Sequence, residues 1–221
     1  MKFENVHLSH EPAPPTHSVG QRRPLVDGIE KVSGRARYTA DLPFPGALVG
    51  RIGRSPVAHG RIVHIDATRA LALPGVRAVV TGDDFSAPYG VIPIAQNEWP
   101  LAREVVRYRG EPLFAVAADD ERSAAAALAA VAVEIDPLPA HFDAASARAE
   151  GAVLLHDSKP GNIERSVEHD FGDVEAGFAA ADLVQERSYE CDEVAHGQIE
   201  LNASLAEWDA AAEPSEEIQF T

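Results

Sequence analysis

Cysteine is nearly absent from this sequence. The 221 residues contain one, Cys191, so the chain cannot form an internal disulfide. A single thiol also excludes an iron–sulfur cluster held by this chain alone, because such clusters need about four thiolate ligands.

Long apolar runs and basic residues are also scarce. No stretch approaches the roughly 20 apolar residues that a membrane helix needs, and residues 1–18 have no apolar core of the kind a secretory signal carries. The chain has 19 Lys and Arg against 35 Asp and Glu, a formal net charge of −16. Since binding to phosphate backbones or anionic lipids depends on Lys and Arg, we expect no nucleic-acid partner and no membrane surface as a partner. Without a signal segment or a membrane helix, we expect a cytoplasmic location.

The common catalytic and nucleotide-binding motifs are missing. The sequence has no G-x-G-x-x-G, no G-x-x-x-x-G-K-[ST], no H-E-x-x-H and no G-x-S-x-G. His7 and His10 lack further ligands nearby, which favours two separate tail histidines over a metal site. His59 and His64 are five residues apart on extended chain and so point to opposite faces.

One pair of side chains has a spacing that suits chemistry. His196 and Glu200 lie four residues apart, which places them on the same face of a strand about 13 Å apart, or next to each other on a helix. We interpret this pair as structural hydrogen-bonding groups rather than catalytic ones. Composition and spacing alone thus indicate an acidic protein with helices and strands and no assigned activity.

The first 24 residues are rich in Pro and His and predict an arm without regular structure. Two strand–helix–strand units follow. The first is predicted from strands at 47–55 and 61–67, a helix at 67–73 that Asp66 caps and Pro74-Gly75 ends, and a strand at 76–82. The second is predicted from a strand at 113–118, a helix at 121–130 capped by Asp119 or Asp120, and a strand at 131–136. Together they predict a mixed sheet with helices on one side.

A long segment from Phe85 to Arg103 separates the two units. It contains three prolines and bulky apolar residues, among them Tyr89, Ile94 and Trp99. Loops of this length inside a compact domain usually bind something. The alternative is that these side chains pack on their own domain.

Composition shifts near residue 145. Beyond it the pattern predicts a coil at 156–163, a helix at 172–184 capped by Asp173, and strands at 186–193 and 198–209. The sequence stops at IQFT, within what the pattern predicts to be a further strand, so we expect a truncated domain.

Several of these segments resemble one known family. PLVDGIEKVSGRARYTADLPFPGALVGRIGRSPVAHGRIVHIDATRALALPGVRAVVTGDD and VVRYRGEPLFAVAADDERSAAAALAAVAVEIDPLPA look like the α/β-hammerhead domain of xanthine dehydrogenase and aldehyde oxidase large subunits. PGNI, GDVEAGF and the segment from His196 to Glu200 are similar to the start of the molybdopterin-binding domain that follows there. The resemblance implies an α+β fold, with an arm at 1–24, a hammerhead domain at 25–145 and an incomplete molybdopterin-binding domain at 146–221.

Within the family, VIPIAQNEWPLAREVVRYRGEP and IELNASLAEWD look most like the 4-hydroxybenzoyl-CoA reductase branch. That resemblance implies reductive removal of a phenolic hydroxyl from an aromatic acyl-CoA at a molybdenum cofactor. It also implies an iron–sulfur subunit, a FAD subunit and the remaining C-terminal part of the large subunit as partners. A hydroxylase of the xanthine dehydrogenase or aldehyde oxidase type is the alternative.

No residue here matches the family's cofactor loops or its active-site glutamate, so no catalytic, cofactor-binding or metal residue is carried over. We expect the chain alone to bind no cofactor, to be inactive and to serve an architectural role. Tyr89, Ile94 and Trp99 are the candidates for lining the substrate approach. Two other interpretations stay open, a free-standing hammerhead adaptor and a degenerate gene product that is unstable from Leu183 onward.

Overall fold

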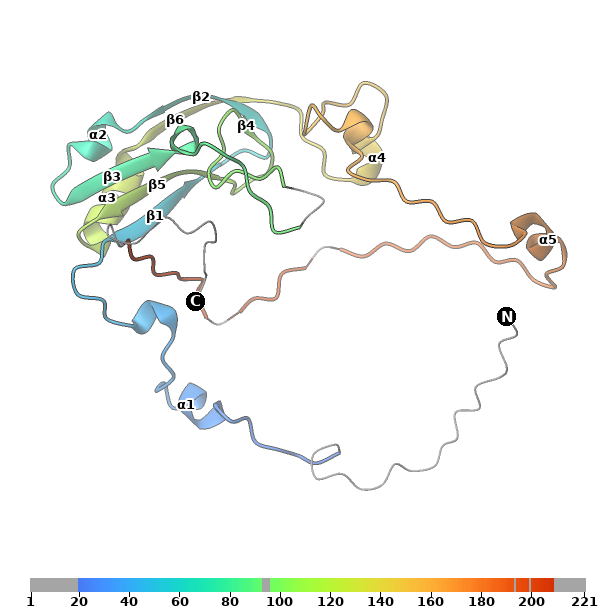
Figure 1. Ribbon diagram of the computed structural model, residues 1–221, viewed down its shortest axis with the longest axis horizontal. Helices are drawn as coiled ribbons and strands as arrows, with labels where there is room; N and C mark the ends of the chain where they lie inside the picture. Colours follow the sequence, from blue (N-terminus) through green and yellow to red (C-terminus); the bar gives the residue numbers. More distant parts are fainter. Residues whose placement is uncertain (1–19, 93–95, 193, 199, 209–221) are drawn as a thin grey trace. The chain divides into compact units, whose positions relative to one another are not determined.

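The computed structural model describes residues 20–92, 96–192, 194–198 and 200–208. The chain divides into two units, residues 45–189 and residues 1–44 together with 190–221. Ile94, His7 and His10 lie outside the described residues. Figure 1 shows that the named strands all belong to the larger unit.

The larger unit contains two three-stranded sheets. The first has the order β1-β5-β3, with β1 at Val49–Arg54, β5 at Pro112–Ala118 and β3 at Val76–Thr81. The second has the order β4-β2-β6, with β4 at Val105–Val106, β2 at Gly60–Asp66 and β6 at Ala132–Pro137. Every pairing between these strands is antiparallel.

The two strand–helix–strand units interlock across these sheets. In the first unit, α2 (Thr68–Leu71) joins β2 to β3; in the second, α3 (Glu121–Ala130) joins β5 to β6. Each unit sends one strand to each sheet, so β2 pairs with β6 and β3 pairs with β5. The α+β fold is confirmed, but the strands form two antiparallel sheets rather than one mixed sheet. Residues 67–75 are too few for the crossover of a dozen or more residues that parallel neighbours need.

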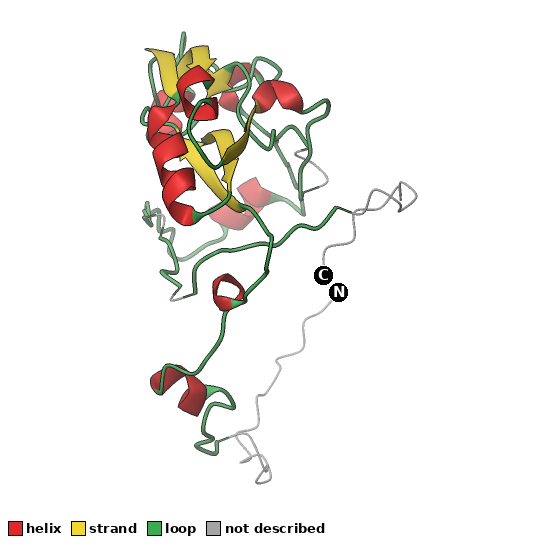
Figure 2. Cartoon of the chain, turned by 90° about the vertical axis from the view of Figure 1, so that its left-hand side faces the viewer, coloured by secondary structure: helices red, strands yellow, loops and turns green. Residues whose placement is uncertain are grey.

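Helix α3 covers the first sheet. It packs against β1, β3 and β5 and against α2, and Figure 2 shows it lying alongside the strands. Ala124 and Ala127, three residues apart on α3, are both fully buried. Alanine at these positions lets the helix backbone come close to the sheet, where Leu113 and Val116 of β5 are fully buried.

Aspartates cap α3 and α5 as the sequence predicts, whereas α2 has Ala67 at its N-cap and Asp66 accepts a hydrogen bond from the Thr68 backbone N–H, at 2.8 Å. Asp120 Oδ1 accepts a hydrogen bond from the Ser123 backbone N–H at 2.8 Å, and Asp173 Oδ1 accepts one from Ala176 N–H at 2.9 Å. Asp119 does not cap α3; it forms an ion pair with Arg77 at 2.6 Å instead. These caps satisfy backbone donors that have no partner inside the first helical turn.

The remaining secondary structure of the described residues consists of short helices and 3-10 helices. They are α1 at Gly28–Val32, η1 at Thr39–Asp41, η2 at Gly82–Asp84, α4 at Ala144–Ala147, η3 at Pro160–Asn162 and α5 at Val174–Ala179. Helix α5 is therefore shorter than the helix predicted over 172–184.

The strands predicted at 186–193 and 198–209 are wrong for the residues described there, which carry no strand. Their large side chains are exposed; the side chain of Trp208, for example, is 89% exposed. Alternation marks a segment that fits a sheet, but a strand forms only when a neighbouring strand accepts its hydrogen bonds. Without a strand, the spacing argument for His196 and Glu200 does not hold, and Cys191 is exposed in the same segment.

Local stability should differ along the chain. Residues 47–137 hold the sheets and the buried core, whereas most residues described from 164 to 208 are exposed. We expect amide hydrogens of β5 and α3 to exchange far more slowly than those of 186–208, because few buried contacts oppose local opening there. Hydrogen-exchange mass spectrometry on the 221-residue chain measures this directly. Uniform protection over both regions would contradict it.

Candidate functional site

Within the loop from Phe85 to Arg103, Tyr89 and residues between 97 and 102 form one wall of a cavity of about 200 Å³. Tyr89 and Glu98 form an isolated antiparallel bridge with two backbone hydrogen bonds, 2.8 and 2.9 Å long, which holds the two arms of the loop together. The bridge brings Tyr89 and Trp99 to the same cavity, and Arg103 stacks over the Trp99 ring with its Cζ 4.6 Å from the ring centroid. We call this the aromatic cavity.

The opposite wall of the aromatic cavity is polar and comes from distant parts of the chain. Glu111 stands at the start of β5, Tyr108 lies in the turn before it, and His156 belongs to the segment after α4. Arg107 Nε donates a hydrogen bond of 2.8 Å to the Leu155 carbonyl, which ties this segment to the wall. The sequence could not predict that Glu111 and His156 line one cavity, because they are far apart in the chain and only this tertiary contact brings them together.

Burial perturbs the titrating groups of the aromatic cavity. It raises the pKa of Glu111, although that carboxylate accepts a hydrogen bond from the Arg107 backbone N–H. It also raises the pKa of Tyr108 and lowers the pKa of His156, with Arg107 adding to the latter effect. Shifts of this kind in a cavity are common at functional sites and also occur in purely structural networks.

The aromatic cavity suits binding better than bond-breaking. The rings of Tyr89, Trp99 and Tyr108 line it and fit a planar aromatic group. Among the described residues, no cluster of three His, Cys, Asp or Glu is placed to hold a metal ion. The predicted residues Tyr89 and Trp99 are thus brought together, while Ile94 cannot be placed.

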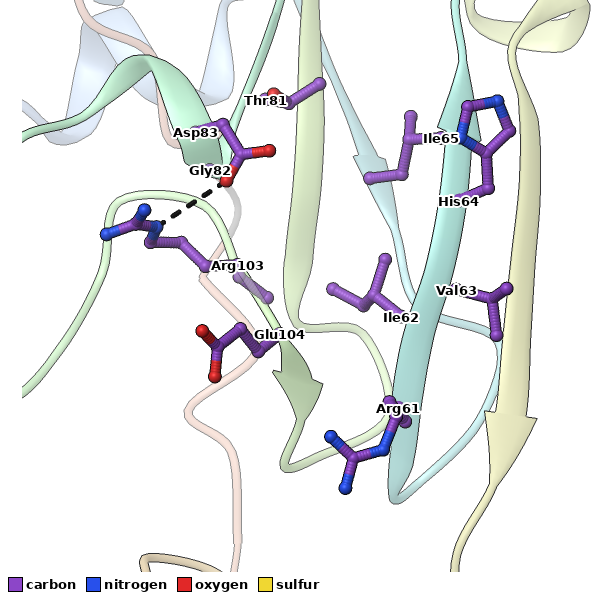
Figure 3. A pocket seen from close by; sticks show the side chains of 11 residues that line it. Arg61, Ile62, Val63, His64, Ile65, Thr81, Gly82, Asp83, Arg103 and Glu104 are labelled. Carbon is purple, nitrogen blue, oxygen red and sulfur yellow. Dashed lines mark ion pairs between the residues drawn. The ribbon is translucent and has the colours of Figure 1, made fainter.

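A second cavity, of about 500 Å³, is a groove beside β2 (Figure 3). It runs along residues 61–65 of β2 and is closed on the other side by η2 and residues 102–104. Strand β4 pairs with β2 only at Gly60 and Arg61, and the Ile62 N–H donates to the Glu104 carbonyl at 2.8 Å. Beyond that bond, no strand pairs with this edge of β2 within the described residues. The groove lies along this unpaired edge.

Side chains of both charges border the groove. Figure 3 shows Ile62 and Ile65 on the side of β2 that faces the ion pair of Asp83 with Arg103, whose Oδ1 and Nε are 3.7 Å apart. Gly82 lies so close to the next segment that a Cβ there would stand 2.5 Å from the Ala102 carbonyl oxygen. The backbone approach that shapes this wall therefore requires glycine.

The two histidines near β2 have separate environments. His59 is 2% exposed, and its Nδ1 lies 2.7 Å from the Pro139 carbonyl oxygen. His64 is exposed and borders the groove. No metal cluster joins them within the part of the chain that the structure describes.

Replacing Glu111 with glutamine should remove one pH-dependent contribution to stability. Burial makes folded Glu111 hold its proton more tightly than the unfolded carboxyl, whose ordinary pKa is 4.5. Its contribution is therefore fully present below the unfolded pKa and is lost as pH rises through the folded pKa. We expect Glu111→Gln, which keeps an acceptor for the Arg107 N–H, to become more stable relative to the unmodified chain as pH rises.

Urea denaturation at a series of pH values tests this expectation. Glu150→Gln is the matched control, since it removes a carboxylate from an exposed position. A difference in unfolding free energy between Glu111→Gln and the unmodified chain that stays constant with pH would contradict the buried-carboxyl argument.

None of the helices in the described ranges has the length and apolar character to cross a membrane. Two family models match the chain in succession. Residues 33–139 match the a/b hammerhead domain of aldehyde oxidase and xanthine dehydrogenase, and residues 155–216 match the molybdopterin cofactor-binding domain.

Relatives with curated names are similar over most of this chain. A probable xanthine dehydrogenase subunit of Bacillus subtilis is 36% identical over 182 residues, which cover 81% of this chain and 24% of that protein. The nicotinate dehydrogenase large molybdopterin subunit of Eubacterium barkeri is 33% identical over 195 residues, covering 86% of this chain and 44% of that protein. The chain thus spans less than half the length of either relative.

Solved structures share the fold. The Cu,Mo-CO dehydrogenase matches with a TM-score of 0.60 and 33% identity over 74% of this chain and 23% of that one. The aldehyde oxidoreductase of Desulfovibrio gigas matches with a TM-score of 0.58 and 29% identity over 72% of this chain and 19% of that one.

Proposed function

The chain belongs to the aldehyde oxidase and xanthine dehydrogenase family, and we propose that it serves as the hammerhead-bearing part of the large subunit in a molybdenum-dependent oxidoreductase. The proposal rests on the order of the two matched domains, the hammerhead domain and then the start of the molybdopterin-binding domain. The two interlocked sheets lie within the residues matched to the hammerhead domain. The boundaries at residues 24 and 145 remain predictions.

The described residues of the second matched domain do not by themselves fit a molybdopterin. Those from 164 to 192 are largely exposed, and the cavity beside α5 is lined mostly by apolar groups such as Val174, Phe178 and Leu183. It offers no charged donor to a phosphate or a metal from the described residues. We therefore assign no redox step to these residues. We propose that the described part of the chain binds the other subunits and supports the cofactor domain.

The architectural role rests on the surfaces of the hammerhead unit. The groove beside β2 leaves an unpaired strand edge, and such edges accept a strand from another segment or chain. We propose that this unit contacts the iron–sulfur subunit of the complex and the remainder of the large subunit, with a FAD subunit completing the electron path. Among the relatives, one is named as a subunit of the 6-hydroxypseudooxynicotine dehydrogenase complex.

Within the family, we propose 4-hydroxybenzoyl-CoA as the substrate. Residues 91–112 and 199–209 resemble the 4-hydroxybenzoyl-CoA reductase branch, and the aromatic cavity with Tyr89 and Trp99 would accept an aromatic ring on its way to the cofactor. The relatives carry names that specify xanthine, nicotinate, nicotine and carbon monoxide. Hydroxylation of a nitrogen heterocycle is therefore the second candidate.

Three experiments test these proposals. Mixed with the cluster-bearing subunit of the same organism, the 221-residue chain should co-elute on size exclusion, whereas a free-standing adaptor would elute alone or as its own dimer. The assembled enzyme should reduce 4-hydroxybenzoyl-CoA with a viologen donor and not oxidise nicotinate or xanthine. Stoichiometric molybdenum in the isolated chain, measured by metal analysis, would overturn the architectural role.

A further inference from the structure

We propose that a third cavity, which adjoins the aromatic cavity and shares Arg107 and Tyr108 with it, binds an oxyanion of the phosphate class. Its volume is about 160 Å³, and its charged or ionisable lining comprises Arg107, Arg109, His59, His141 and Tyr108. No carboxylate of the described residues lines it. We call it the anion cavity; the inference does not depend on which reaction the assembled enzyme performs.

Arg107 brings a positive charge that forms no salt bridge within the described ranges, although Glu111 is near enough to interact electrostatically with Arg107 and His59. Its guanidinium donates to two backbone carbonyls, Leu155 through Nε at 2.8 Å and Val105 through Nη1 at 3.4 Å. Glu111 accepts the backbone N–H of Arg107 and lines the aromatic cavity instead. The carbonyls fix the plane of the guanidinium, and a planar fork of donors held in place is the arrangement that recognises phosphate oxygens.

Two histidines complete the cavity, one from the turn before β2 and one from the segment after β6. The hydrogen bond between His59 Nδ1 and the Pro139 carbonyl fixes the His59 ring. His141 Nε2 is buried and has no hydrogen-bond partner in the described structure. An unpaired buried polar atom is unfavourable, so a ligand oxygen entering the cavity beside it would restore the missing bond.

The local charge contrasts with that of the whole chain. The formal net charge is −16, yet two arginines meet here at a cavity that the described carboxylates do not line. Such a concentration of one sign in a low-dielectric recess attracts ions of the opposite sign. The volume suits a phosphate ion or a terminal phosphate group, and Arg109, which also lines the cavity, is exposed.

The test titrates the 221-residue chain with inorganic phosphate at constant ionic strength, using calorimetry and the NMR signals of the histidine rings. We expect saturable binding that shifts the His59 and His141 signals. Arg109→Gln, at an exposed position, should weaken binding about tenfold, the loss of one charge-assisted hydrogen bond. Arg122→Gln, which removes an exposed arginine on α3 away from the cavity, should leave the affinity unchanged.

Phenyl phosphate in place of phosphate distinguishes the two sources of this group. Tighter binding of the ester identifies the ligand as a phosphate monoester, and equal binding identifies the free ion. Thermal melting of each variant confirms that it is folded. Non-saturable binding, or equal weakening by Arg109→Gln and Arg122→Gln, would overturn the proposal.

Discussion

Replacing Leu113 with alanine is expected to lower the free energy of unfolding of the hammerhead unit by about 2–5 kcal/mol. Leu113 is 0% exposed and lies in β5, the central strand of the first sheet. It belongs to the same core cluster as Phe114, Val116 and the α3 alanines. Truncation there removes buried apolar surface and leaves a cavity that the interlocked strands cannot close.

Urea denaturation of the 221-residue chain, followed by circular dichroism, measures this loss. Leu71→Ala is the matched control, because Leu71 is 53% exposed at the end of α2 and should cost less than about 1 kcal/mol. Similar losses for the two substitutions would show that the core is not centred on β5.

Deleting residues 88–100 from the large subunit of an assembled enzyme is expected to raise the substrate KM by about tenfold or more, with a smaller effect on kcat. The deletion removes Tyr89 and Trp99 and with them one wall of the aromatic cavity. Contacts made equally with substrate and transition state raise KM when lost, without slowing the chemical step in proportion. This expectation rests on the proposed substrate approach.

A pair of point variants makes the test sharper. The chain has two tryptophans, Trp99 in the aromatic cavity and Trp208 at 89% exposure. Trp99→Ala should raise KM in the direction of the deletion, whereas Trp208→Ala should leave it unchanged. Unchanged steady-state kinetics for the deletion variant would show that the loop does not line the substrate approach.

Much of the secondary structure could be predicted because it depends on neighbours along the chain. Alternating apolar residues marked β1 and β2, and short runs rich in apolar residues marked β3, β5 and β6. Asp120 and Asp173 marked helix starts, because each cap is made to a backbone N–H three residues later. Resemblance identified the family, and the matched domains confirm it.

Pairing partners could not be predicted in the same way. Alternation at 186–193 and 198–209 suits a strand, but the residues described there have no neighbouring strand and stay exposed. The same pattern at β2 does become a strand, because β6, which lies much later in the sequence, supplies the hydrogen bonds.

The amino-acid sequence by itself indicated the strands and helix caps between residues 47 and 137, showed that one cysteine can hold neither a cluster nor a disulfide, and identified the family that the chain resembles. Only the tertiary structure decided that the two units interlock into two sheets, and that Arg107, Glu111 and His156 meet beside Trp99. The reason is physical. Helix caps and side-chain alternation act over a few residues, whereas sheet pairing and cavities depend on segments that are far apart until the chain folds.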